Sequence, residues 1–172
     1  MDKKNKYIIT FAGPVGSSKT PIAHYLSSNL GLPIYNNDAV RTEIIEDLLH
    51  FDEEKFRKRT KERINSALAR GNPLIIDASV DRKWEYLSPF IQKYNYTYFI
   101  ISIDFTQELL KKIYKAKRYH ESLKEIERLL NEHQQFKETF GHEIGFSLQD
   151  KDFPNRLELS LTAVKNFVSK KF

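Results

Sequence analysis

A strand, a glycine-rich turn and a helix follow one another directly near the start of this chain. Tyr7–Ala12 is a short run of β-branched and aromatic residues, which is typical of a buried strand. From Lys19 to Leu30 the apolar residues recur at helical spacing, and Gly31 is a natural stop for that helix. A strand that leads directly into a helix is the first half of a βαβ unit, so this order favours a parallel sheet.

The same alternation of short apolar runs and amphipathic segments continues along the chain. Further strands are expected at 33–36, 73–77 and 97–103, and helices from Asn37 or Asp38 to about 50, from Asp52 to about 70, and at 83–93, 106–117 and 121–139. Residues 141–155 are expected to form a partly ordered loop, 156–161 a fifth strand, and Thr162 to open a last helix.

This pattern predicts a three-layer α/β/α fold with a five-stranded parallel sheet. The 172 residues show no repeat or linker, and one domain over 1–172 is long enough to bury a core. Right-handed crossovers bring the carboxyl ends of parallel strands to one edge, where ligands bind. The glycine-rich turn, Asp77 and Asp104 are therefore expected to meet at that edge.

The amino-acid composition excludes some kinds of site and favours one kind of ligand. The chain has no cysteine, which excludes disulfides, thiolate metal sites and a cysteine nucleophile. Residues 1–6 are charged, and no apolar run approaches the ~18 residues needed to span a bilayer, so a cytoplasmic protein without a membrane partner is expected. The formal net charge of +5 favours an anionic ligand such as a nucleotide or nucleic acid.

The turn after the first strand carries a phosphate-binding pattern. Gly13, Lys19 and Thr20 match the spacing Gly, four residues, Gly, Lys, Ser or Thr, and Ser18 replaces the second glycine. Backbone N–H groups and the following helix end would bind phosphate, with Lys19 at the β- and γ-phosphates and Thr20 on Mg²⁺. The expected nucleotide-binding residues are Gly13, Pro14, Val15, Gly16, Ser17, Ser18, Lys19 and Thr20.

Ser18 is a departure from the pattern. If its position needs a positive φ, serine adds strain that glycine avoids and reduces affinity for nucleotide. The alternative interpretation is a tight turn with an incidental Lys-Thr pair. The strand–loop–helix context favours the phosphate loop.

Residues 13–20, followed by 32–41, resemble small P-loop kinases of the polynucleotide kinase and zeta-toxin type. These belong to the adenylate kinase-like group of P-loop NTPases and are often described as AAA family ATPases. The resemblance covers about the first hundred residues well and the remainder in outline. It implies ATP and Mg²⁺ as cofactors, and transfer of the γ-phosphoryl group to a hydroxyl or phosphate of a small molecule or nucleic-acid end.

The resemblance also assigns roles to single residues. Asp38 would activate the acceptor hydroxyl, Arg41 and Arg82 would contact the acceptor, and Asp77 would hold Mg²⁺ through water. Asp38 is alternatively a helix N-cap, and both roles can coexist. Asp104 competes with Asp77 for the metal-side role and is alternatively a strand end or a helix cap.

A basic lid is expected at about 111–140 by the same resemblance. Arg118 is the chosen catalytic cation because its planar guanidinium suits phosphate, with Lys115, Lys117 and Lys124 as alternatives and a solvated helix face as the competing interpretation. The basic residues at 57–63 could guide a nucleic-acid or nucleotide acceptor, but Glu53 and Glu54 before them and Glu62 among them favour a solvated helix face. The five histidines show no metal-ligand spacing.

Two other functions compete with a kinase. One is a nucleotide-binding module without catalysis, which Ser18 favours. The other is a basic nucleic-acid-binding protein with a degenerate phosphate loop, which the net charge favours. A monomer or a homodimer is expected in each case.

Overall fold

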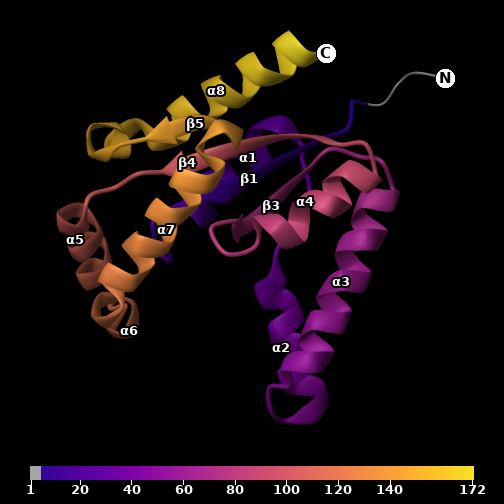
Figure 1. The fold of residues 1–172 in the computed structure, drawn as a ribbon, viewed down its shortest axis with the longest axis horizontal. Helices are drawn as coiled ribbons and strands as arrows, with labels where there is room; N and C mark the ends of the chain where they lie inside the picture. The colour runs from indigo at the N-terminus through magenta and orange to yellow at the C-terminus, as the bar shows by residue number, and fades with distance from the viewer. Residues whose placement is uncertain (1–4) are drawn as a thin grey trace.

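The computed structural model describes residues 5–172 and confirms the three-layer α/β/α fold (Figure 1). Five parallel strands form one sheet in the order β2-β3-β1-β4-β5. The strands are β1 Tyr7–Ala12, β2 Ile34–Tyr35, β3 Leu74–Ser79, β4 Thr97–Ile103 and β5 Ile144–Leu148. Most of the charged segment 1–6 lies outside the described residues, as does the start of the expected domain.

Helices connect the strands and cover both faces of the sheet (Figure 1). They are α1 Lys19–Leu30, α2 Asn37–Leu48, α3 Glu53–Ala69, α4 Trp84–Lys93, α5 Gln107–Lys117, α6 His120–Lys124, α7 Ile126–Phe140 and α8 Arg156–Lys171, with 3₁₀ turns η1 Gly141–Glu143 and η2 Asp150–Asn155. Asp52 caps α3 as expected, because its carboxylate accepts the Lys55 amide at 2.9 Å. Within residues 5–172, no helix is both long and apolar enough to cross a bilayer.

The central strand β1 is buried along its whole length and supplies both cores. Ile9 and Phe11 point toward α1 and α8, whereas Ile8 points toward α3 and α4. This alternation follows from the two-residue period of a strand. Because both faces of the sheet are covered, the sequence of the strand is almost continuously apolar. Gly13 directly follows its carboxyl end and therefore lies at the sheet edge.

The expected fifth strand at 156–161 is wrong, because these residues form the first part of α8. Leu157, Leu161 and Val164 pack on the α1 side of the sheet at helical spacing, whereas Leu159 is exposed. The last helix thus opens at Arg156 and not at Thr162.

The true edge strand, β5, lies in the segment expected to be a loop. Its alternate residues Ile144, Phe146 and Leu148 are at least half-buried, and it pairs with β4. Gly141 before this short run and Gly145 inside it obscured the pattern, and pairing with a preformed neighbour outweighs weak local propensity.

Two helix starts also differ from expectation. Asn36, and not Asn37 or Asp38, caps α2, and its side chain accepts the Asp38 amide at 2.6 Å. The helix expected at 121–139 is two helices, α6 and α7, that meet near Glu125. The first difference frees the Asp38 carboxylate from a capping role.

Gly145 gives a direct test of β5. A Cβ at this position would lie 2.4 Å from Cε2 of Phe99, a buried ring that also stacks on Phe167. We expect Gly145→Ala to reduce the free energy of unfolding by about 1–3 kcal/mol through overpacking, measured by urea denaturation. Gly141→Ala is the matched control, since nothing lies within 4 Å of its Cβ position. Equal stability of the two variants would contradict the position of β5.

Candidate functional site

The loop between β1 and α1 has the backbone of an anion-binding nest. Gly13 has φ 131°, Gly16 has φ 74° and Ser18 has φ 86°, so residues of positive φ are interspersed with residues of negative φ along the loop. A Cβ on Gly13 would lie 3.1 Å from both Ile103 Cβ and Ile103 O, so strain and crowding each select glycine there. Ser18 has the positive φ that glycine usually supplies.

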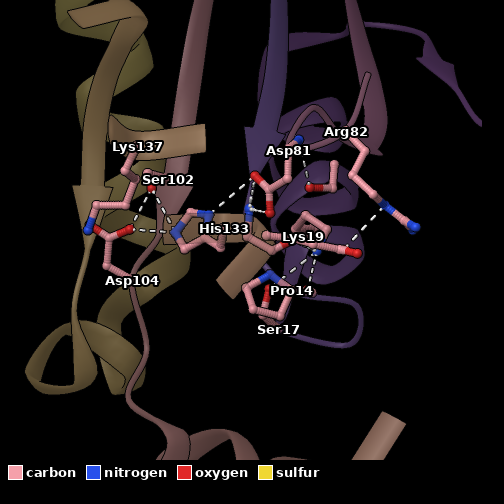
Figure 2. Close-up of polar contacts among 12 residues, drawn as sticks. Pro14, Ser17, Lys19, Asp81, Arg82, Ser102, Asp104, His133 and Lys137 are labelled. Atoms are coloured by element: carbon pink, nitrogen blue, oxygen red, sulfur yellow. Dashed lines mark hydrogen bonds and ion pairs between the residues drawn. The ribbon is translucent and has the colours of Figure 1, made fainter. Parts of the chain in front are cut away.

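Lys19 is folded back onto its own loop. Its Nζ donates to Gly13 O at 2.8 Å, to Pro14 O, and to Ser17 Oγ at 3.3 Å (Figure 2). Burial lowers the pKa of the Lys19 ammonium to about 8, although the carboxylates of Asp81 and Asp77 oppose the shift. A half-buried cation that is bonded to two carbonyl oxygens and a hydroxyl is well placed to exchange them for phosphate oxygens.

Thr20 and Asp77 meet at the start of α1. Thr20 Oγ1 donates to Asp77 Oδ1 at 3.2 Å, and Asn36 Nδ2 donates to Asp77 Oδ2 at 3.3 Å. Burial raises the pKa of the Asp77 carboxyl above its usual value, against the hydrogen bond from Thr20. A hydroxyl and a carboxylate at this distance are hard oxygen donors that fit Mg²⁺, which also takes water and nucleotide phosphates as ligands.

A cavity of about 650 Å³ opens over the phosphate loop. The loop and the end of β3 form one side, the start of α2 and the lid helices form the others, and Asp38 lines it from α2. Within residues 5–172, the Asp38 carboxylate makes no hydrogen bond or ion pair, so it is free to act on a ligand. Lys19, Thr20, Asp77 and Asp38 therefore share one cavity.

Only some of the cations that the sequence predicts for the acceptor and lid positions line this cavity. Arg82 lines the cavity and pairs with Glu132 at 3.3 Å (Figure 2). Arg41 does not line it; its guanidinium stacks 4.2 Å from the Phe51 ring centre. Arg118 does not line the cavity either; it is the C-cap residue of α5 and has a positive φ. The neighbouring Lys117 does line the cavity.

Two side chains of α5 contact the phosphate loop directly. Tyr114 Oη donates to Val15 O at 2.6 Å, and Lys117 Nζ donates to Gly16 O at 3.0 Å. Burial lowers the pKa of the Lys117 ammonium. These bonds give the Val15 and Gly16 carbonyls partners outside the loop.

A buried polar cluster behind the loop was not predicted. Asp81 accepts the Gly13 amide with its two oxygens at 3.0 and 3.1 Å, and His133 lies between Asp81 and Asp104 (Figure 2). His133 comes from the buried stripe of α7, between Leu129 and Phe136. A histidine on an otherwise apolar helix stripe was the available signal. Asp104 faces this cluster and does not line the cavity, whereas Asp77 does.

Arg156 is a second contact that sequence reasoning missed. Its Nε donates to Ser18 Oγ at 2.6 Å, and its Nη1 donates to Phe153 O at 2.7 Å. The serine hydroxyl thus ties the start of α1 to the start of α8. This bond offsets part of the strain of a positive φ at Ser18 and accounts for a side chain where the pattern has glycine.

A double-mutant cycle measures this coupling. We expect Arg156→Met to reduce the free energy of unfolding by about 1–2 kcal/mol in the wild type, and by less when Ser18 is already glycine. Urea denaturation of the four proteins gives the interaction energy. An equal cost in both backgrounds would show that Arg156 acts through Phe153 and not through Ser18.

No protein-family model and no curated protein sequence matches this chain. Solved structures match it over nearly its full length. A shikimate kinase of Acinetobacter baumannii in complex with shikimate has TM-score 0.62 and 16% identity, covering 99% of this chain and 97% of that chain. An APS kinase of Mycobacterium tuberculosis in complex with AMPPNP and APS has TM-score 0.57 and 14% identity, covering 94% and 99%.

A tunicamycin resistance protein of Deinococcus radiodurans has TM-score 0.65 and 13% identity, covering 94% of this chain and 95% of that chain. All three identities are low, so the likeness concerns the fold. It supports the P-loop kinase fold in general and not the polynucleotide kinase and zeta-toxin type in particular. This chain has the fold of small P-loop kinases.

Proposed function

We propose that this protein is an ATP-dependent phosphotransferase that moves the γ-phosphoryl group to a hydroxyl or phosphate of an acceptor. The observation that carries the proposal is the shared cavity. Lys19, Asp77 and Asp38 line it together, although they come from three separate parts of the chain. A phosphate cradle opposite a free carboxylate is the arrangement that phosphoryl transfer to a hydroxyl requires.

On the donor side, the loop amides bind the phosphates and Lys19 leaves its carbonyl partners for the β- and γ-oxygens. Lys117 is the lid cation that lines the cavity, so it replaces Arg118 as our first choice for stabilising charge in the transition state. Residues 111–140 act as the lid of one domain in this proposal.

On the acceptor side, Asp38 accepts the proton of the attacking hydroxyl. Arg82 lines the same cavity and orients an anionic acceptor after exchanging its partner Glu132. Arg41 is a more distant contact, because its guanidinium stacks on Phe51.

Mg²⁺ fits the donor set of Thr20 and Asp77 and would supply positive charge to the transferring phosphoryl group. Among residues 5–172, no group of three or more His, Cys, Asp or Glu side chains could hold a metal ion. Thr20 and Asp77 would therefore share the ion with nucleotide phosphates and water.

A small-molecule acceptor is favoured over a nucleic-acid end. Two of the structural relatives are kinases named for small molecules, shikimate and APS. The basic face of α3 is also partly neutralised, since Arg57 pairs with Glu53, Arg59 with Asp47 and Arg63 with Glu43. Use of ATP places the reaction in the cytoplasm in this proposal.

The test combines nucleotide binding with transfer from ATP labelled in the γ-phosphate. Shikimate, APS, tunicamycin and an oligonucleotide with a free 5′ hydroxyl form the acceptor panel. We expect Mg²⁺-assisted binding of ATP that Lys19→Met reduces by at least tenfold, because the variant loses the cation beside the phosphates. Asp38→Asn is expected to bind ATP normally and to reduce transfer by ~10²-fold or more.

Matched controls separate these effects from general damage. Lys165→Met removes an exposed lysine of α8, and Glu46→Gln removes an exposed carboxylate of α2, and neither variant should alter binding or transfer. Tight ATP binding without transfer to any acceptor would instead support the non-catalytic nucleotide-binding module, which Ser18 at a positive φ favours. Absence of ATP binding in the wild type would contradict both functions.

A further inference from the structure

The cluster behind the phosphate loop places one histidine between two carboxylates. His133 Nδ1 lies 3.2 Å from Asp81 Oδ1, and His133 Nε2 lies 2.8 Å from Asp104 Oδ1 (Figure 2). Asp104 also accepts from Ser102 Oγ at 2.6 Å and pairs with Lys137 Nζ at 3.1 Å. The side chains of His133 and Asp81 are only 6% and 7% exposed.

This geometry defines the charge of the cluster. Both ring nitrogens of His133 face a carboxylate oxygen, and only the imidazolium donates from both nitrogens. Two carboxylates, the imidazolium and the Lys137 ammonium then sum to zero. Burial acts to lower the pKa of the His133 ring, but the bonds to Asp104 and Asp81 outweigh burial and raise that pKa.

Three elements supply the polar groups around His133. Asp81 comes from the loop after β3, Ser102 and Asp104 come from the end of β4, and Lys137 comes from α7 itself. Lys137 reaches only Asp104 among these carboxylates. His133 is therefore the cationic side chain in direct contact with the Asp81 carboxylate.

Asp81 connects the cluster to the nucleotide site. Its carboxylate accepts the amide of Gly13, the first residue of the phosphate loop, and its side chain lines the cavity. A carboxylate beside a loop that receives several phosphate charges opposes binding unless that charge is compensated. Lys19 attracts the Asp81 carboxylate but forms no ion pair with it, since its ammonium donates to Gly13 O, Pro14 O and Ser17 Oγ.

We propose that His133 is a positioning residue for the proposed phosphotransfer: it holds the Asp81 carboxylate on the Gly13 amide and neutralises it, so that the phosphate loop accepts a polyphosphate anion. The role rests on the proposed function and acts through Asp81, without contact between His133 and the substrate. Removal of His133 leaves Asp81 charged and free to turn toward Lys19.

A charge-suppression cycle tests the role. The dissociation constant of the ATP analogue AMPPNP with Mg²⁺ is measured for the wild type, His133→Gln, Asp81→Asn and the double variant. We expect His133→Gln to weaken binding about tenfold or more, the effect of one uncompensated charge at a partly exposed site. Adding Asp81→Asn should recover most of the loss, because asparagine keeps an oxygen for the Gly13 amide and carries no charge.

His142→Gln is the matched control, since this histidine is largely exposed and should leave binding unchanged. Wild-type affinity in His133→Gln would overturn the proposal. So would a double variant that binds no better than His133→Gln, because a purely structural histidine predicts no rescue by the loss of a carboxylate.

A titration of the wild-type protein keeps the proposal testable if His133→Gln does not fold. Nitrogen-15 NMR of the histidine rings, without nucleotide, should give His133 a midpoint above the ordinary histidine value of about 6.5 and a doubly protonated ring below that midpoint. The Gly13 amide signal should shift with the same midpoint. A His133 midpoint at or below the ordinary value would overturn the proposal. Failure of the wild type to bind AMPPNP would contradict the proposed function, and this titration would still decide on His133.

Discussion

The rest of the site depends on how the loop after β1 is held open. Gly13, Gly16 and Ser18 have positive φ values, and the loop carbonyls accept from side chains. Lys19 donates to Gly13 O, and the α5 side chains Tyr114 and Lys117 donate to Val15 O and Gly16 O. The loop is therefore fixed both by its own lysine and by two groups distant in sequence, which gives it a defined shape before any anion binds.

Two further contacts join walls of the cavity to each other. Asp81 and Arg82 are adjacent in the loop after β3, and they bind His133 and Glu132, which are adjacent on α7 (Figure 2). Helix α7 is thus bonded to both residues of the loop after β3. A displacement of α7 would act on Arg82 directly and on Gly13 through Asp81, which accepts the Gly13 amide.

Sequence reasoning identified the features that depend on local order and missed those that depend on tertiary contact. The strand–loop–helix unit, the cap at Asp52 and the sheet-edge carboxylate Asp77 follow from nearby residues. In contrast, β5 exists because β4 is beside it, and the residues after it become α8 because their leucines find the α1 side of the core. The partners of Asp81 and Ser18 lie 52 and 138 residues away, so no local pattern reveals them.

The most direct test of the central claim is a crystal structure of the protein with Mg²⁺ and AMPPNP. The account predicts the β- and γ-phosphates on the loop amides, with Lys19 Nζ moved from Gly13 O and Pro14 O to phosphate oxygens, and Asp38 facing the γ-phosphate across the cavity. Two results at saturating AMPPNP would contradict this expectation. One is nucleotide bound elsewhere on the protein, and the other is an empty cavity with Lys19 Nζ still bonded to Gly13 O and Pro14 O.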